Sequence, residues 1–453
     1  MMRRTAAILV LATSIAGLPG CGGSGPAEAP QVVADANTVA RAATGDQNAV
    51  EDWATIVLPA ITNPGEPRPP VSSEVVATTI HLAVYDAVVA IEGGYQPYAK
   101  AIEAPRGASL RAAIATAAYR TARGRVAASQ FAYLDQKYGD YLADIPGGPA
   151  KDDGVQVGGA AAAGVLALRA HDGFADTVAY TCSAKLLPMG EFQPNGGCGT
   201  EPVDAKIARV KPFTFSDPAQ FRPHGPDRFA SPRWVRDFNE VKAYGRADST
   251  VRTPEQTDLV YFWSEHAYVF WTRNLVALAL AKHLDEAGTA RLFAMAHTAA
   301  SDASIAGFEA KYFYRSWRPR TAIPRATEDG NTKTAPEQAW TPLLTVNHPE
   351  YPSGHGFFST ALTDAVAEFF GTRRMTWTLV ASKNTVPQLV RTERTYQSLD
   401  AVMRDISDAR VWAGLHFRNS MRQGGALGDR VEKHVMKGYF RPIRSRDDAS
   451  AKP

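Results

Sequence analysis

The chain has 453 residues, 45% of them hydrophobic and 21% charged, which is ordinary for a globular protein with a large buried core. Length alone allows two or three domains. The 49 Lys and Arg residues against 46 Asp and Glu residues give a formal net charge of +3. Because the basic residues are dispersed along the chain, the charge pattern gives no support to a nucleic-acid-binding function.

Residues 1–21 have the pattern of an export signal. Two arginines precede an apolar run from Ala6 to Leu18, and Cys21 follows it. The run is too short to cross a bilayer as a helix, which takes ~20 apolar residues. A Cys directly after such a run resembles a bacterial lipoprotein cleavage site, although Pro19 departs from the small residue usual there. We therefore predict an exported lipoprotein of the periplasm or cell envelope, attached to the membrane by a lipid on Cys21, with a soluble secreted protein as the alternative.

Composition divides the rest of the chain. Small and neutral-to-polar residues without an apolar period predict a flexible tether over residues 22–47. Helical periodicity then predicts an N-terminal helical half at 48–250 and a C-terminal helical half at 251–440, followed by a polar tail at 441–453.

Apolar residues at three-to-four spacing, bounded by Gly, Pro or Asp, predict a series of helices. The expected helices are 53–61, Val75–Ile91, Leu110–Ala128, Val155–His171, Pro232–Tyr244, Thr253–Ala281, Glu286–Tyr314, Phe357–Phe370, Val386–Ser407 and Leu415–Lys437. Within 253–281, Trp263, His266, Phe270 and Trp271 are interpreted as one buried face. Alternating runs of β-branched residues are almost absent. We therefore predict an all-α fold of two packed helical bundles around one continuous core.

Between residues 181 and 232 the helical period disappears, and many prolines and glycines predict an irregular insertion. Such a long loop is uncommon unless it is stapled or functional. Cys182 and Cys198 bracket its first part and have no His near them, which favours a structural disulfide over a metal or redox pair. This disulfide would close a loop of ~15 residues and stabilise the fold by on the order of 3 kcal/mol.

The last third of the chain carries three clusters of groups that can bind an anion. In the first, Lys311 is followed seven residues later by Arg318 and then by Pro319. On one helix the two cations would lie two turns apart on the same face, and Pro319 would end the helix or leave Arg318 at its edge. Both side chains can then reach one oxyanion, with the guanidinium binding two oxygens. A solvated basic face is the alternative.

The second cluster is Ser353-Gly354-His355, which lies directly before the apolar run Phe357–Phe370. A glycine-rich turn that opens a helix presents free backbone amides and the positive end of the helix dipole to an anion. Ser353 adds a hydroxyl group, and His355 adds a group that titrates near neutral pH. A simple capping turn is the alternative.

The third cluster is Arg410, followed six residues later by His416. On one unbroken helix these residues would be about 240° apart and would point to different faces. Gly414 lies between them and can break the helix so that both side chains turn inward. We therefore predict a break here, with His416 in the first turn of a new helix. A capping His beside an exposed Arg is the alternative.

The order and spacing of the three clusters resemble the shared signature of the type-2 phosphatidic acid phosphatase and vanadium haloperoxidase superfamily. Further stretches resemble bacterial vanadium-haloperoxidase-like proteins, so the resemblance covers most of the globular chain; they are Ala77–Ile91, Phe221–Pro223, Ser231–Gly245, Arg318–Ile323 and Trp340–Leu343. The resemblance implies two four-helix bundles and a site that holds vanadate, or phosphate of the same shape and charge.

The resemblance also implies roles for the cluster residues. His416 matches the residue that ligates vanadate, or the nucleophile that is phosphorylated in phosphatase members. His355 matches an acid/base residue. The groups that neutralise and hydrogen-bond the equatorial oxygens are matched by Lys311, Arg318 and Arg410, together with Ser353 and the amide of Gly354.

Three further positions bear on the subtype. His348 stands where bromide-oxidising members resemble this chain and fungal chloride-oxidising members carry Phe, and Phe308 stands where the latter carry Trp. Both residues favour bromide or iodide over chloride. Ser420 replaces an Asp that many members carry and that orients the His in phosphatases, which argues against efficient phosphoryl transfer.

The sequence therefore favours a vanadium-dependent haloperoxidase. Vanadate bound through His416 would let hydrogen peroxide oxidise a halide to hypohalous acid, which reacts with a small organic acceptor, and Lys311 would assist by hydrogen bonding. One alternative is an acid phosphatase that acts through phosphorylated His416. A second is a non-catalytic oxyanion-binding lipoprotein, against which two imidazoles in one pocket argue.

Overall fold

The computed structural model describes residues 48–62, 65, 67–180, 182 and 187–443. The predicted export signal with Cys21 and the predicted tether at 22–47 lie outside these residues. The polar tail at 441–453 lies outside them beyond residue 443.

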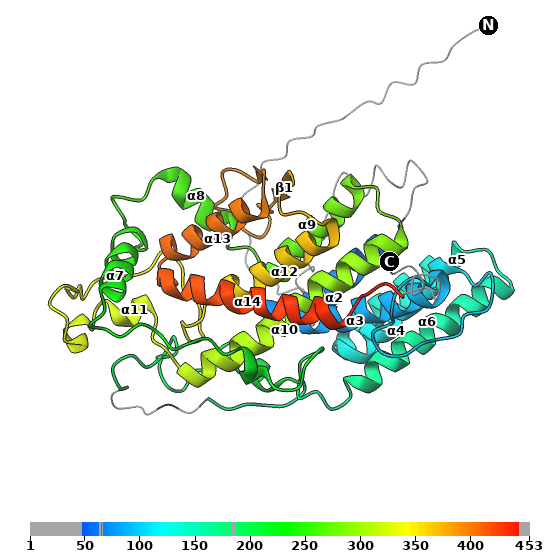
Figure 1. Cartoon of the computed structure of the whole chain (residues 1–453), viewed down its shortest axis with the longest axis horizontal. Coiled ribbons are helices and arrows are strands. Elements are labelled where there is room, and N and C mark those ends of the chain that lie inside the picture. Colours follow the sequence, from blue (N-terminus) through cyan, green and yellow to red (C-terminus); the bar gives the residue numbers. More distant parts are fainter. Residues whose placement is uncertain (1–47, 63–64, 66, 181, 183–186, 444–453) are drawn as a thin grey trace, which may run out of the picture. The chain divides into compact units, whose positions relative to one another are not determined.

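The described chain is helical, as predicted. Its helices are α2 (Ala49–Thr62), α3 (Pro70–Glu92), α4 (Leu110–Arg125), α5 (Phe131–Ala143), α6 (Pro149–Leu168), α7 (Pro232–Tyr244), α8 (Pro254–Phe262), α9 (Ala267–Ala281), α10 (Glu286–Tyr314), α11 (Pro319–Ala322), α12 (Gly354–Phe370), α13 (Leu399–Trp412) and α14 (Arg418–Gly438) (Figure 1). The strands are β1 (Trp377–Val380) and β2 (Glu393–Tyr396), which pair antiparallel.

One hydrophobic core extends from Ala49 in α2 to Phe440 after α14, in agreement with the prediction of a continuous core. The long helix α10 connects the N-terminal and C-terminal helices of this core, since it packs against α3 and also against α12 and α14. Helix α3 is long and apolar enough to cross a membrane, but 89% of its most apolar window is buried among the described residues, which is typical of a core helix.

Close packing of α12 on α14 depends on glycines. A Cβ atom on Gly424 would lie 2.6 Å from the carbonyl oxygen of Ser353, and one on Gly356 would lie 2.9 Å from the carbonyl oxygen of Met421. Larger residues would therefore push the two helices apart. The contact brings the start of α12 against α14, where the amide of Ser353 donates to the carbonyl oxygen of Ser420 at 3.1 Å.

Two secondary-structure predictions need correction, and one helix was missed. The expected helix Thr253–Ala281 is two helices, α8 and α9, with residues 263–266 between them. The expected helix Val386–Ser407 is wrong in its first half, because Glu393–Tyr396 forms β2 and Ser398 caps the start of α13 by accepting from the amide of Ala401. Helix α5 was not predicted, and its weak signal has a physical reason: Leu134 is its only buried residue.

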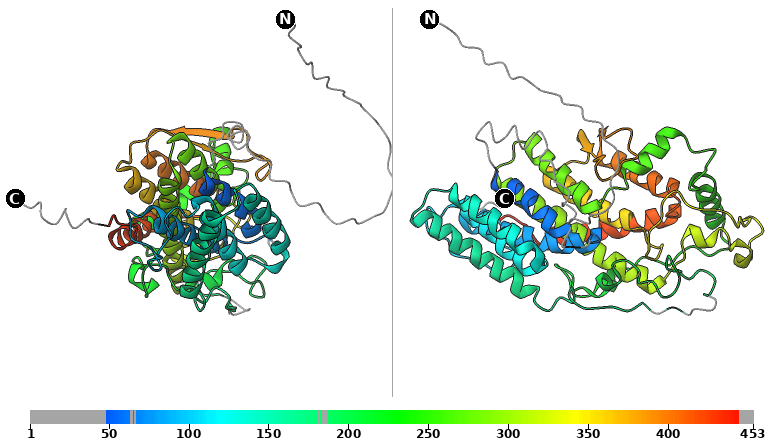
Figure 2. Two further views of the ribbon diagram at one scale, coloured as in Figure 1. Left: turned by 90° about the vertical axis from the view of Figure 1, so that its right-hand side faces the viewer. Right: turned by 180° about the vertical axis from the view of Figure 1, so that it is seen from behind.

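The insertion is irregular as expected, with 3₁₀ turns at Ala205–Arg209 and Pro218–Phe221, and it runs along one side of the helical body (Figures 1 and 2). Cys182 and Cys198 form the predicted disulfide, with Cα atoms 5.5 Å apart. The loop that it closes docks on the segment before Arg318, because the amide of Phe192 donates to the carbonyl oxygen of Arg315 at 2.6 Å.

Candidate oxyanion site

Lys311 lies in the last turn of α10 and is fully buried. Its Nζ donates to the carbonyl oxygens of Pro349 and Glu350 at 2.8 and 3.0 Å. The helix ends at Tyr314, three residues later, where Arg315 adopts a left-handed conformation with φ of 49°. The predicted shared helical face of Lys311 and Arg318 is therefore wrong: Arg318 lies outside α10 and precedes α11, which Pro319 begins.

Arg318 connects two loops. Its Nε donates to the carbonyl oxygen of His348 at 2.6 Å, and its Nη1 donates to that of Leu415 at 2.8 Å. Its Nη2 lies 3.0 Å from His348 Nδ1. The same Nδ1 lies 3.2 Å from the carbonyl oxygen of Pro349, so this nitrogen faces both a donor and an acceptor.

The second cluster opens a helix, as predicted. Ser353 is the N-cap of α12 and its hydroxyl accepts from the amide of Gly356 at 3.4 Å. The helix begins at Gly354, so the amides of its first turn lack partners within the helix. A Cβ atom on Gly354 would meet only the ring of Phe357, at 3.9 Å, so the space beside this backbone is open.

Arg410 and His355 share a backbone partner. Arg410 lies in the last turn of α13, and its Nη1 donates to the carbonyl oxygen of Trp263 at 2.9 Å. His355, half-buried in the first turn of α12, also hydrogen-bonds the backbone of Trp263. This carbonyl is free for the purpose because α8 ends at Phe262. The sequence identified Trp263 only as part of a buried face, since the break between α8 and α9 carries no Gly or Pro.

His416 lies in the break between α13 and α14. Gly414 has the predicted role in that break, with φ of 76° and with the backbone of Gly245 against it. Helix α14 starts at Arg418, after the N-cap Phe417, so the prediction that His416 lies in the first helical turn is wrong by two residues. Its Nδ1 lies 2.8 Å from Glu350 Oε1, and the same oxygen accepts from the amide of Phe417 at 3.1 Å.

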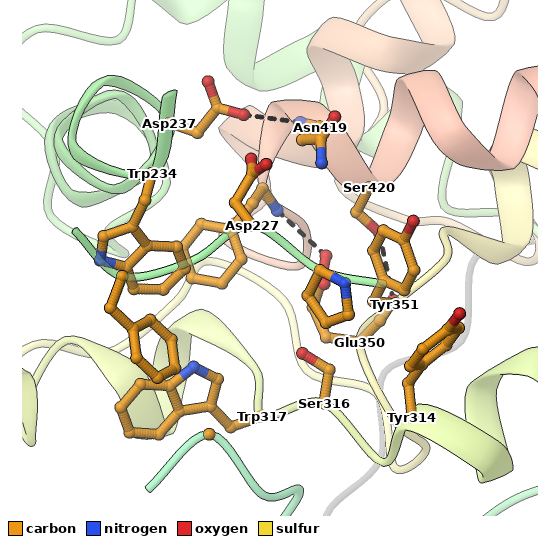
Figure 3. Close-up of a pocket in the computed structure, with 14 residues that line it drawn as sticks. Asp227, Trp234, Asp237, Tyr314, Ser316, Trp317, Glu350, Tyr351, Asn419 and Ser420 are labelled. Atoms are coloured by element: carbon orange, nitrogen blue, oxygen red, sulfur yellow. Dashed lines mark hydrogen bonds between the residues drawn. The ribbon is translucent and has the colours of Figure 1, made fainter. Parts of the chain in front are cut away.

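Glu350 is a residue that the sequence analysis missed. It is buried, and burial raises its pKa to about 7, although Lys311 and Arg318 act in the opposite direction. In the sequence, only its position three residues before Ser353 pointed to Glu350. The fold shows that this loop passes beside His416. In Figure 3, Glu350 and Ser420 line a cavity whose other walls include the rings of Trp234 and Trp317.

The remaining predicted residues surround this centre. The rings of His348 and Phe308 lie with their centroids 5.4 Å apart, next to Lys311. Ser420 is buried in α14, and its hydroxyl donates to the main-chain carbonyl of Glu350 at 3.3 Å. It therefore contacts the loop that carries Glu350.

Burial and charge determine the ionisation of the two imidazoles. Burial is the largest cause that lowers the pKa of His416 well below its usual value, and Arg318, Lys311 and Arg410 lower it further. Burial and Arg410 likewise lower the pKa of His355, and Lys311 and Arg318 contribute. Both rings are therefore neutral near neutral pH, and both sense all three cations, which places the three clusters around one centre.

The positive charge of these three cations also disfavours a conventional metal-ion site. Among the described residues, no group of three or more His, Cys, Asp or Glu side chains is arranged to hold a metal ion. Cations, a hydroxyl and helix N-terminal amides instead suit a multiply charged oxyanion.

Residues 291–445 match the family described as the VCPO second helical-bundle domain. A comparison with curated proteins found no match. Among solved structures, the chain is similar to a bacterial vanadium-dependent iodoperoxidase, with a TM-score of 0.71 and 19% identity over 88% of this chain and 96% of that one. It is also similar to a bacterial vanadium-dependent chloroperoxidase in its holo form, with a TM-score of 0.64 and 19% identity over 82% of this chain and 93% of that one. At this level of identity the likeness shows the fold.

Proposed function

We propose that the chain is a member of the vanadium haloperoxidase family and acts as a vanadate-dependent haloperoxidase. The match of residues 291–445 to a VCPO second helical-bundle domain and the fold shared with bacterial vanadium-dependent haloperoxidases support this proposal. In this reaction hydrogen peroxide oxidises a halide to hypohalous acid, which then halogenates a small organic acceptor.

The proposal is carried by three buried cations. Lys311, Arg318 and Arg410 are 0%, 2% and 4% exposed, and their hydrogen bonds go to backbone carbonyls or to His348. Within the described part of the chain none of them forms an ion pair. Burying unpaired charge costs several kcal/mol per ion, so a bound anion of high charge would stabilise this arrangement.

The donor set also fits vanadate. Lys311 has a third N–H beyond its two carbonyl contacts, and the buried Nε of Arg410 has no hydrogen-bond partner among the described residues. His416 would hold the group through Nε2, because Nδ1 faces Glu350. Once bound, vanadate would supply Lewis-acid activation of hydrogen peroxide.

The protein's own groups would do the remaining work. The three cations would stabilise negative charge on the oxyanion, where low exposure strengthens their effect. Neutral His355, held by the backbone of Trp263, would accept a proton and return it.

We propose bromide or iodide as the preferred halide. The imidazole of His348 lies beside the guanidinium of Arg318 and against the ring of Phe308. A polar imidazole here would interact with a halide differently from the apolar Phe of fungal chloride-oxidising relatives. The His348→Phe variant should therefore change the ratio of bromide to chloride oxidation, and an unchanged ratio would remove this part of the proposal.

The proposed activity is tested with purified protein, hydrogen peroxide, bromide and a phenol dye, with and without vanadate. We expect bromination of the dye only when bromide and vanadate are both present. An acid phosphatase would instead hydrolyse an aryl phosphate, and this oxyanion site can also hold phosphate. Aryl phosphate turnover without vanadate-dependent bromination would contradict the haloperoxidase proposal and support that alternative.

We also propose that the protein is exported and carries a lipid on Cys21, which is supported by the pattern of residues 1–21. Radioactive palmitate should label the wild type and leave the Cys21→Ser variant unlabelled. A Cys21→Ser protein that stays with the membrane fraction would count against a lipid anchor.

A further inference from the structure

We propose that Glu350 is the positioning residue of His416: its carboxylate holds the imidazole in the tautomer with a proton on Nδ1 and a free electron pair on Nε2. This inference deepens the proposed function and rests on it. Glu350 would thus replace the orienting Asp that related chains carry where this chain has Ser420.

The tautomer follows from the hydrogen bonds around one oxygen atom. Glu350 Oε1 lies 3.1 Å from the amide nitrogen of Phe417, and an amide N–H can only donate. The ionised carboxylate has no proton to donate, so Oε1 accepts both bonds and His416 Nδ1, 2.8 Å away, is the second donor. The electron pair of Nε2 remains available for an electrophilic atom in the oxyanion site.

The backbone of Glu350 is fastened from two sides. Lys311 Nζ donates to its carbonyl oxygen at 3.0 Å, and the hydroxyl of Ser420 donates to the same oxygen at 3.3 Å. The carboxylate accepts from the amide of Phe417 and also interacts with the hydroxyl of Ser420. The carboxylate is consequently held in place before any ligand binds, as a positioning group requires.

The small side chain of Ser420 leaves room for a carboxylate from another segment of the chain to reach His416. Its side chain is short and contacts the Glu350 backbone, while Glu350 Oε1 occupies the hydrogen-bonding position at His416 Nδ1. The orienting acid is thus supplied by the loop before α12 and not by α14. An Asp introduced at position 420 in the absence of the Glu350 carboxylate is therefore a direct rescue test.

The chain contains a matched control for this pair. Glu74 Oε1 in α3 lies 2.8 Å from His297 Nδ1 in α10, and both side chains are fully buried. His297 lies 14 residues before Lys311 on α10, which corresponds to about 21 Å along the helix axis. Removing the Glu74 carboxylate should lower stability without changing the affinity of the oxyanion site.

The test measures vanadate affinity by equilibrium dialysis for wild type, Glu350→Ala, Glu350→Gln, Glu350→Ala/Ser420→Asp and Glu74→Gln. We expect Glu350→Ala to bind vanadate on the order of 10 to 100 times more weakly, as is typical when an outer partner of a ligating His is lost. Glu350→Gln should show a smaller loss, because its amide oxygen can still accept. Ser420→Asp should restore part of the affinity, and Glu74→Gln should bind as the wild type does.

A second measurement separates this inference from the proposed function. In ¹⁵N-histidine-labelled protein without vanadate, His416 should give the NMR signature of an Nδ1–H imidazole, and Glu350→Ala should abolish or mix that signature. If the wild type fails to bind vanadate, the proposed function is wrong, while the tautomer still tests the inference. Wild-type affinity in Glu350→Ala, or in Glu350→Gln should the alanine variant not fold, would overturn it, and so would an Nε2–H tautomer in the wild type.

Discussion

Arg318 donates from Nη1 to the carbonyl oxygen of Leu415 at 2.8 Å, one residue before His416. Through its Nε it also holds the carbonyl oxygen of His348, two residues before Glu350. One guanidinium thus fixes both loops that supply the His416–Glu350 pair. Arg318 therefore has a structural role in addition to its charge.

Replacing Arg318 by Lys should weaken oxyanion binding by at least about tenfold, even though the positive charge is kept. A single ammonium cannot span both carbonyls in the way that a planar guanidinium does. Phosphate affinity measured by calorimetry checks this, with Arg320→Lys as the matched control, since Arg320 is only half-buried in α11. Equal phosphate affinity in Arg318→Lys and the wild type would show that charge alone matters.

Vanadate or phosphate should stabilise the fold, because either supplies the negative charge that the buried cations lack. At a ligand concentration 100 times Kd, the free energy of unfolding should rise by about 2.7 kcal/mol. Lys311→Met removes one buried charge, so this variant should gain less stability from the anion than the wild type gains. Thermal unfolding with and without phosphate measures both effects, with the exposed Lys383→Met as the control. A full phosphate response in Lys311→Met would be inconsistent with a role in binding.

As pH rises, oxyanion affinity should fall at a lower pH than it would if Lys311 had the usual pKa of a lysine. Burial, and then Arg318, lower the pKa of Lys311 well below its usual value in the free protein. Below that pKa the ammonium is charged and binds the anion; as pH rises through it, the charge and the affinity are lost. In Lys311→Arg the guanidinium stays protonated, so the fall in affinity should move to higher pH. The ratio of the two phosphate affinities across pH isolates this effect, and a constant ratio would refute it.

Gly414→Ala should destabilise the fold and weaken anion binding together. A Cβ atom at this position would lie 2.4 Å from the carbonyl oxygen of Gly245, and φ is 76°. The backbone conformation alone costs roughly 1 kcal/mol, and the clash adds to it, so we expect a loss of at least about 2 kcal/mol. Gly371→Ala is the control, because Gly371 has φ of 68° but nothing within 4 Å of an added Cβ atom. Equal losses in urea unfolding would show that the clash is absorbed.

Most of the fold could be predicted because its helices end at residues with clear physical signals. Pro232 and Tyr244 bound α7 as predicted, and Glu286 and Tyr314 bound α10. The break after Phe262 could not be predicted, since apolar periodicity continues through it. The strand at Glu393–Tyr396 was mistaken for helix because its pairing with β1 is a contact between distant residues.

Some of the site residues could likewise be predicted from the sequence, and others could not. Its cations, His355 and His416 could be found because their spacing resembles a known signature. Glu350 and the carbonyl of Trp263 could not, because each acts through one position in space that only packing creates. Ser420 was read as the loss of an orienting acid, whereas a carboxylate from the loop before α12 lies at His416 Nδ1.

The most direct test of the central claim is the stoichiometry and affinity of vanadate binding in wild type, His416→Ala and, as a control, His171→Ala, which changes an exposed His outside the site. We predict one vanadium per chain in the wild type and in His171→Ala, and at least about 100-fold weaker binding in His416→Ala. Vanadate bound equally tightly by His416→Ala would contradict the assignment of His416 as the ligand and, with it, the account of the site given above.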